Sequence, residues 1–361
     1  MTSNLTGIAS DLIEQHPPEH SLGLKFDQWG TRIDSNNPEL NRHLANYFKQ
    51  CVTDVDSPHT VITAVDMPPP DLGLTFTDWP REGGKTGRKE AFADIEGGRV
   101  IHKVRTKMQF LLGDELRVAV GDCLKNDNQV INFAITQYIT WLMEHGYVIC
   151  HSAAVEWHGK GLMFSGFSGG GKSTLSLHLM SRGAKYTSGD RVLIKYEDGK
   201  VRMKGVPKLP RINPGTALNN PDLQGVVPEE RAAELRKISK DELWQLEEKY
   251  DVYIDKVFGP DRFAPAPDVD ALFVLNWDRN SSEATTITPV DLIERRDLLG
   301  AVMKSPGPFW IPKDGTPPAS KPVVKEEDYL PHVKHLRAFE VSGKADFDAA
   351  CDRIEAMLKD L

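Results

Sequence analysis

The sequence predicts an α/β fold built around a phosphate-binding loop, with a smaller α+β domain before it. A glycine-rich stretch, Gly166–Ser173, lies between an apolar strand pattern and a helix pattern. Segments of strand and helix periodicity alternate around it. The chain has 361 residues, enough for two or three units of about 150 residues each. We therefore expect an N-terminal domain over residues 1–128 and a second domain over residues 129–361.

The first domain mixes short apolar runs with turn-forming clusters. Apolar and polar residues alternate over 100–105 and 116–120, which predicts strands. Residues 37–50 place leucines and aromatic residues on one helical face. Glycine and proline clusters at 67–71 and 81–87 predict loops. The pattern is typical of a small α+β domain and contains no motif to which we assign chemistry.

The second domain begins with a helix over 129–145, and Gly146 suits the left-handed conformation that ends many helices. Strands are predicted at 147–150, 153–157 and 162–165. The glycine-rich stretch then leads into a predicted helix and a further strand, at 172–181 and 192–196.

The C-terminal part carries two unusual stretches. The charged residues 228–258 predict a helical insertion with a solvated face, and residues 311–325 hold four prolines and predict a loop or lid. The remaining elements are predicted strands at 271–277 and 338–341 and predicted helices at 291–302 and 346–358.

Composition excludes several classes of function. The net charge of −8 disfavours a general nucleic-acid binder, because a polyanion would meet a mostly repulsive field. The most hydrophobic window, 130–143, is too short to span a bilayer and predicts a buried helix, so we expect no membrane partner. The four cysteines are scattered without CxxC spacing, and the N-terminus lacks a signal-peptide pattern. We expect a cytoplasmic protein with reduced thiols.

The glycine-rich stretch matches the Walker A pattern Gly166-x4-Gly171-Lys172-Ser173 in full. Glycines allow backbone N–H groups to surround a phosphate, and the helix N-terminus adds partial positive charge. Lys172 is expected at the β- and γ-phosphates of ATP, and the Ser173 hydroxyl at Mg²⁺. The alternative is a glycine-rich turn that matches by accident. The nucleotide-binding candidates are Gly166, Ser168, Gly169, Gly170, Gly171, Lys172, Ser173 and Thr174.

Two further residues are candidates for catalysis. Asp190 begins the strand after the loop helix, where a carboxylate suits Mg²⁺ binding or acceptance of a proton. The alternative is an Asp that serves a turn. His151 precedes the strand of the glycine loop and is a candidate for phosphate contact or proton relay, or else a structural imidazole.

A basic stretch follows, in which Lys208 and Arg211 stand among prolines that exclude regular helix. Their cations are candidates for offsetting phosphate charge in the transition state, and the alternative is ordinary surface charge. His332 and His335 are spaced as a metal pair but have no complementary ligand cluster nearby. We expect no metal other than nucleotide-bound Mg²⁺.

The stretches 151–173, 181–183 and 188–192 together resemble the catalytic core of bacterial HPr kinase/phosphorylase. In that family a histidine precedes the P-loop strand, an Arg-Gly pair ends the loop helix, and an acidic pair follows. The resemblance covers about residues 147–216. It implies a P-loop kinase core of HPr kinase type with a mixed sheet, with ATP and Mg²⁺ as ligands. The glycine loop is also similar to the related nucleotide core of phosphoenolpyruvate carboxykinase.

The sequence departs from the family at two positions. The acidic pair appears as Gly189-Asp190, so one carboxylate is missing. In an alternative register Asp190 is the first acid and Arg191 replaces the second. The family's Glu-Ile-Arg-Gly signature has only a weak counterpart at 202–205, which implies a kinase without phosphorylase activity. The chain is therefore similar to HPr-kinase-related proteins whose substrate is not HPr.

These observations predict an ATP-dependent kinase that phosphorylates a hydroxyl of a protein serine or of a small molecule. The first alternative is an ATP-binding regulatory protein without phosphotransfer, in which ATP orders the proline-rich stretch. The second is a carboxykinase-like enzyme. The expected partners are a nucleoside triphosphate and a hydroxyl acceptor that the sequence does not identify. The pattern is compatible with a monomer or an oligomer.

Overall fold

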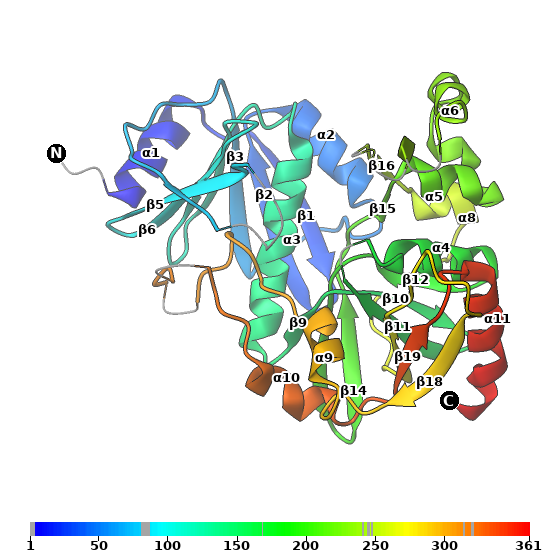
Figure 1. Cartoon of the computed structure of the whole chain (residues 1–361). Coiled ribbons are helices and arrows are strands. Elements are labelled where there is room, and N and C mark those ends of the chain that lie inside the picture. The colour runs from blue at the N-terminus through cyan, green and yellow to red at the C-terminus, as the bar shows by residue number, and fades with distance from the viewer. Residues whose placement is uncertain are drawn as a thin grey trace. The chain divides into compact units, whose positions relative to one another are not determined.

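The computed structural model describes residues 4–80, 87–167, 169–239, 242–243, 246, 248–312, 315–318 and 321–361. The chain divides into two compact units (Figure 1). Unit 1 contains Met1–Gly146 and Ser305–Val323, and unit 2 contains Tyr147–Lys304 and Val324–Leu361. The division falls after Gly146, whereas we had placed it after residue 128. The proline-rich stretch also groups with unit 1 rather than with the unit that carries the glycine loop.

Unit 1 is built on a mixed sheet whose described strands run in the order β1-β2-β3-β8-β7-β6-β5-β4. β3 pairs in parallel with β2 and β8, and the other neighbours are antiparallel. The strands are β1 (His20–Phe26), β2 (Trp29–Ser35), β3 (Thr60–Asp66), β4 (Thr77–Asp78), β5 (Glu90–Ile95), β6 (Gly98–Lys103), β7 (Gln109–Leu112) and β8 (Arg117–Gly121). The helices are α1 (Leu5–Gln15), α2 (Pro38–Tyr47) and α3 (Asp127–Glu144).

Helix α3 belongs to unit 1 because its long apolar face is covered there. Its Tyr138 lies against Phe26 and Trp29, with ring centroids 5.6 and 5.7 Å away. Its Phe133 lies 5.0 Å from Phe110 of the sheet. Burying such aromatic side chains stabilises a helix more than its own propensity does. The predicted helix is present, and its packing moves the boundary between the two units.

The proline-rich stretch has no helix or strand among its described residues, as expected for a loop. Its described part packs on unit 1. The guanidinium of Arg99 donates a hydrogen bond of 2.6 Å to the Pro318 carbonyl, and just before the stretch the buried ring of Phe309 lies 4.6 Å from Phe110. Arg99 is fully buried and also bonds Asp94. These contacts hold the segment in place on its own unit.

Unit 2 contains a six-stranded sheet among its described residues, in the order β12-β10-β11-β17-β19-β18. β17 pairs in parallel with β11 and β19, and the other neighbours are antiparallel, so the sheet is mixed as predicted. A second sheet has the order β14-β13-β9, and β15 pairs with β16. The strands are β9 (Val148–Cys150), β10 (Ser152–Trp157), β11 (Lys160–Gly166), β12 (Lys185–Ser188), β13 (Val192–Glu197), β14 (Lys200–Gly205), β15 (Arg211–Ile212), β16 (Tyr250–Asp251), β17 (Ala271–Leu275), β18 (Thr286–Val290) and β19 (Ala338–Ser342).

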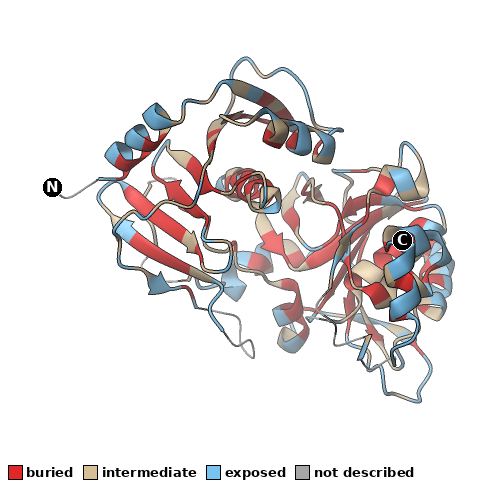
Figure 2. Cartoon of the chain, turned by 90° about the horizontal axis from the view of Figure 1, so that it is seen from above, coloured by how far each residue is buried: buried red, intermediate tan, exposed pale blue. Residues whose placement is uncertain are grey.

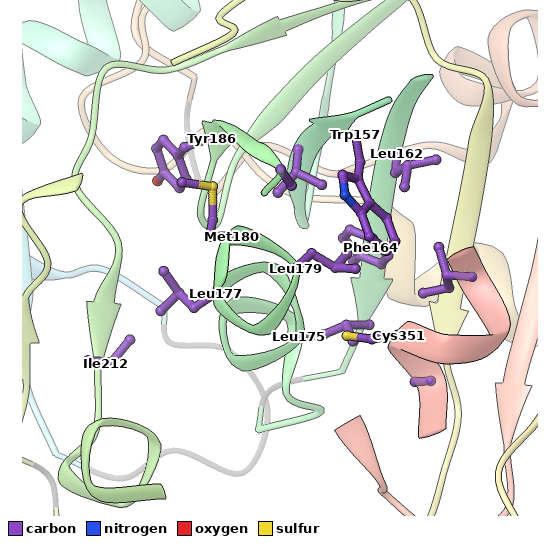
Figure 3. Close-up of a cluster of buried hydrophobic side chains, with 14 of the residues drawn as sticks. Trp157, Leu162, Phe164, Leu175, Leu177, Leu179, Met180, Tyr186, Ile212 and Cys351 are labelled. Carbon is purple, nitrogen blue, oxygen red and sulfur yellow. The ribbon is translucent and has the colours of Figure 1, made fainter. Parts of the chain in front are cut away.

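Helices cover both faces of the larger sheet. Alternate residues of a strand point to opposite faces. Leu162 and Phe164 of β11 therefore join the cluster with α4 and α11 (Figure 3), and Met163 joins the cluster with α9 and α10. The central strands β11 and β17 are almost entirely buried, and Figure 2 shows buried strands in red beside helices whose outer faces are exposed. The helices are α4 (Lys172–Ser181), α5 (Pro214–Asn219), η1 (Pro221–Val226), α6 (Glu229–Leu235), α8 (Ile254–Phe258), α9 (Arg296–Val302), α10 (Glu326–Val333), α11 (Phe347–Met357) and η2 (Leu358–Asp360).

The charged insertion is only partly helical. Helices α6 and α8 lie inside the predicted range 228–258, but β16 lies between them. Residues 240–241, 244–245 and 247 of this range lie outside the described residues. β16 of the insertion pairs with β15 of the basic stretch. The charge pattern did not indicate this tertiary contact.

Candidate functional site

The glycine loop connects β11 to α4, as the sequence predicted. Gly169 and Gly171 have φ angles of 83° and 87°, in the left-handed region that favours glycine. A Cβ on Gly171 would also lie 2.8 Å from the Phe347 ring, so a larger residue is excluded there on both grounds. Gly171 is the N-cap of α4 and offers no side chain to the first N–H groups of the helix. Ser168 lies outside the described residues.

Lys172 is held against the loop. Its Nζ donates a hydrogen bond of 2.8 Å to the Gly166 carbonyl, and its residue exposure is 7%. Burial, opposed by Asp190 and reinforced by Lys304, lowers the pKa of Lys172 to about 8. An ammonium group in this position gains strongly from an anion at the loop, because little water competes for it.

The next two residues of α4 connect the loop to other segments. The Ser173 hydroxyl donates to the Gly189 carbonyl at 3.2 Å, which brings it beside Asp190. The Thr174 and Thr216 hydroxyl oxygens lie 3.0 Å apart. Gly189 itself is confined, because a Cβ there would lie 2.8 Å from the Tyr186 hydroxyl oxygen. The backbone position before Asp190 therefore has no room for an acidic side chain without a shift of Tyr186.

Asp190 lies at the centre of a group of basic side chains. Its carboxylate oxygens are 3.4 Å from His151 Nε2, 3.3 Å from Lys304 Nζ and 3.9 Å from Arg191 Nε. Its side chain keeps 51% of its accessible surface, so it remains open to a ligand. Desolvation raises the pKa of Asp190, but the His151 bond and the charges of Lys304 and Arg191 outweigh it and lower the pKa below its usual value.

His151 stands where the chain leaves one sheet of unit 2 for the other. It lies between β9, in the three-stranded sheet, and β10, in the six-stranded sheet. Its backbone N–H donates to the Val302 carbonyl at 2.7 Å. Desolvation lowers the pKa of its imidazole, Asp190 opposes this, and Lys304 and Lys172 add to it. The ring is therefore neutral at physiological pH and faces a carboxylate.

The two basic-stretch candidates differ. Burial, together with the charges of Arg191 and Arg211, lowers the pKa of Lys208 to about 8, so Lys208 lies in the same electrostatic environment as Asp190. Arg211 is 43% exposed and forms an ion pair of 3.1 Å with Asp251 of β16. The charge of Asp190 thus acts on Lys208, whereas Arg211 pairs with the insertion.

The sequence analysis missed three residues of the site. Lys304 and Trp277 had no signal in their local patterns, and Arg191 was considered only as a replacement for an acid. Trp277 follows β17, which is parallel to β11 and so ends at the same sheet edge as the glycine loop. Its Nε1 donates to the Gly170 carbonyl at 2.9 Å. The end of a neighbouring parallel strand is the signal that could have found it.

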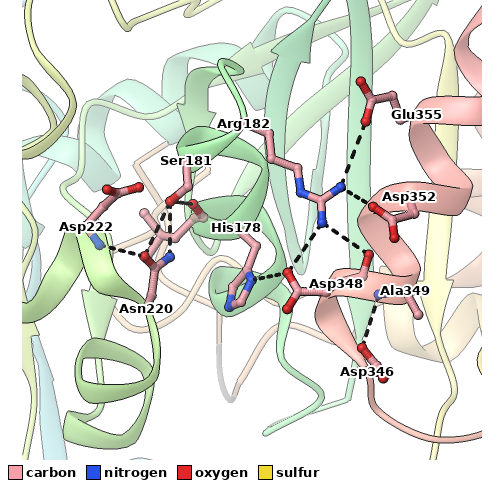
Figure 4. Close-up of polar contacts among 11 residues, drawn as sticks. His178, Ser181, Arg182, Asn220, Asp222, Asp346, Asp348, Ala349, Asp352 and Glu355 are labelled. Carbon is pink, nitrogen blue, oxygen red and sulfur yellow. Dashed lines mark hydrogen bonds and ion pairs between the residues drawn. The ribbon is translucent and has the colours of Figure 1, made fainter.

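A polar cluster lies between α4 and α11, the helix that carries Phe347 (Figure 4). Arg182, at the end of α4, donates to Asp352 at 2.5 Å and to Asp348 at 3.3 Å. His178 Nδ1 lies 3.6 Å from the same Asp348, and its ring stacks on Phe347. The cluster thus lies next to the aromatic ring that approaches Gly171 of the glycine loop.

The remaining candidates have structural partners. His332 Nδ1 accepts a hydrogen bond from the Tyr196 N–H, and His335 stacks on the Tyr196 ring at 3.5 Å. Within the part of the chain that the structure describes, no group of three or more His, Cys, Asp or Glu could hold a metal ion. No helix in that part is long and apolar enough to cross a membrane.

Comparisons with known proteins add little to this geometry. A scan against protein-family models and a search of curated proteins find no match. Among solved structures, that of the Hpr(Ser) kinase/phosphatase from Coxiella burnetii is similar at 10% identity and a TM-score of 0.30. The match covers 59% of this chain and 99% of that chain. An overlap this loose assigns neither a fold nor an activity.

Proposed function

We propose that this protein is an ATP-dependent kinase that transfers the γ-phosphoryl group to a hydroxyl of a protein serine or of a small molecule. The observation that carries the proposal is the bond between Ser173 and the Gly189 carbonyl. This bond connects the glycine loop, which carries Lys172, to the segment of Asp190. A phosphate bound at the loop would therefore lie close to a carboxylate. Phosphoryl transfer needs chiefly such positioning and electrostatic stabilisation.

The residues present suit a Mg²⁺-triphosphate. Within the described residues, the buried Nε of Arg191 has no hydrogen-bond partner, and this nitrogen faces Asp190 at 3.9 Å. Lys172 is buried, Lys208 is partly buried, and the charge of Asp190 acts on both. A bound anion would stabilise the charged forms of the two lysines. Ser173 and Asp190 supply the oxygen ligands that Mg²⁺ prefers.

Bound ATP would supply the transferable phosphoryl group. The glycine-loop N–H groups and Lys172 would hold its phosphates, and Asp190 would bind the metal ion and orient the acceptor hydroxyl. The lowered pKa of Asp190 makes it a weak base. His151, which is neutral, is better suited to accept the hydroxyl proton.

A regulatory ATP-binding protein is the second candidate. It is favoured by the confined Gly189, which leaves Asp190 without an acidic neighbour, and by the cations that surround Asp190. Such a site would bind nucleotide without transferring phosphate.

Labelled ATP separates the two candidates. Purified protein is incubated with γ-labelled ATP, Mg²⁺ and a lysate of its own cells, beside Lys172→Ala and Asp190→Asn. If the protein is a kinase, an acceptor becomes labelled with the wild type and with neither variant, and Asp190→Asn still binds ATP. ATP binding by the wild type with no labelled acceptor would establish the regulatory reading instead.

A further inference from the structure

Lys304 reaches the site from a distant part of the sequence and is held there by backbone contacts. Met303 forms an antiparallel bridge with Cys150, and Val302 accepts the His151 N–H. The Lys304 N–H donates to the Tyr329 hydroxyl oxygen at 3.2 Å, and this hydroxyl donates to the Ile149 carbonyl at 2.5 Å. These backbone contacts fix the position of Lys304, and its side chain is only 16% exposed.

The Lys304 ammonium group forms an ion pair with the Asp190 carboxylate, the group that would bind a metal ion. Its Nζ lies 3.3 Å from Asp190 Oδ2. A divalent cation at Asp190 would repel a neighbouring ammonium group, and at this separation the repulsion is strong unless water screens it. Lys304 would then be attracted to a phosphate group bound beside the metal ion. The backbone contacts of residues 302–304 keep the Lys304 side chain within this site.

We propose that Lys304 is a second phosphate-binding lysine, which contacts the terminal phosphate and makes the site prefer ATP to ADP. The inference rests on the proposed function. Asp190 is the group expected to orient the acceptor hydroxyl, so a residue beside Asp190 lies at the terminal phosphate rather than at the nucleoside end. Lys304 Nζ and His151 Nε2 lie 3.3 and 3.4 Å from the two carboxylate oxygens of Asp190, which places the Lys304 ammonium group at this point.

The test compares the affinities of Mg²⁺-bound ADP and of a non-hydrolysable ATP analogue by titration calorimetry. In Lys304→Met the preference for the triphosphate falls about tenfold, the loss expected for one charge-assisted hydrogen bond. Lys304→Arg retains most of the preference. Lys200→Met is the matched control, since Lys200 forms an ion pair of 2.9 Å with Asp268 and is 62% exposed. It leaves the preference unchanged.

The outcomes distinguish this inference from the proposed function. If Lys304 only neutralises Asp190, Lys304→Met changes both affinities by the same factor, and the inference is overturned. If Lys304→Met does not fold, Lys304→Gln and Lys304→Arg decide by the same ratio. Wild-type protein that binds neither nucleotide would overturn the proposed function together with the inference.

Discussion

The indole Nε1 of Trp277 donates a hydrogen bond of 2.9 Å to the Gly170 carbonyl, so a side chain after β17 holds the backbone of the glycine loop. The Phe347 ring lies 5.0 Å from the indole and closes on the neighbouring Gly171. A ligand that reorganises the loop must therefore change the surroundings of this tryptophan.

We predict that ATP with Mg²⁺ changes the tryptophan emission of the wild type and that Trp277→Phe abolishes the change. Loss of one neutral hydrogen bond, about 1 kcal/mol, should also weaken ATP binding about fivefold. Fluorescence titration measures the emission change, and calorimetry measures the ATP affinity of both proteins. Trp141→Phe, in unit 1, is the control and should keep the signal. A signal that survives Trp277→Phe would place the reporter elsewhere.

Asp190→Asn should separate binding from transfer. The amide removes the negative charge and the metal ligand but keeps the shape, so phosphotransfer should fall about a thousandfold. ATP binding in the absence of Mg²⁺ should persist. Transfer assays and calorimetry check the two halves. The exposed Asp261 has a φ of 57°, which Asn tolerates, so Asp261→Asn is a matched control. Equal losses in the two variants would contradict the role of Asp190.

ATP binding should take up protons above neutral pH. The pKa of Lys172 and of Lys208 is about 8 in the free protein, and a bound triphosphate favours their charged forms. Both lysines therefore gain protons on binding, and affinity should fall as the pH rises through about 8. Calorimetry in two buffers of different ionisation heat measures the uptake. Lys208→Met should reduce it, and an uptake of zero in the wild type at pH 8 to 9 would refute the prediction.

The contact between the sheet of unit 2 and its helices should depend on packing more than on charge. Phe164 is fully buried and stacks on Phe273 with centroids 5.6 Å apart, so Phe164→Ala should lower the free energy of unfolding by about 3–5 kcal/mol. Arg182→Met removes ion pairs to carboxylates that are 53% or more exposed and should cost about 1 kcal/mol or less. Urea unfolding measures the loss of stability in each variant. A larger loss in Arg182→Met than in Phe164→Ala would show that the polar cluster holds α11.

Elements with strong local patterns were predicted well. The strand, glycine loop and helix of 160–181 lie where the sequence placed them, because alternation, left-handed glycines and helical spacing are properties of neighbouring residues. Helix α3 was also predicted, but its assignment to the second domain did not match the division into units. Which sheet covers an apolar helix depends on long-range packing, which periodicity does not specify.

The candidate site likewise contains residues that the sequence predicted and contacts that it did not predict. Lys172 and Ser173 were predicted from the motif, and the structure joins Ser173 to the segment of Asp190. Arg211 was grouped with Lys208 because both are basic, but the pairing of β15 with β16 directs Arg211 to Asp251. A charge pattern shows which residues are cations and does not show which carboxylate each one meets.

The sequence by itself determined the glycine loop between a strand and a helix, the α/β character and the absence of a second acid beside Asp190, since local residue patterns specify each of them. Only the tertiary structure decided that Lys304 joins Asp190, that Trp277 holds Gly170 and that Tyr186 confines Gly189. The physical reason is that these contacts join residues far apart in the chain or in different elements. They follow from the order in which strands pair and helices pack, which a local pattern does not encode.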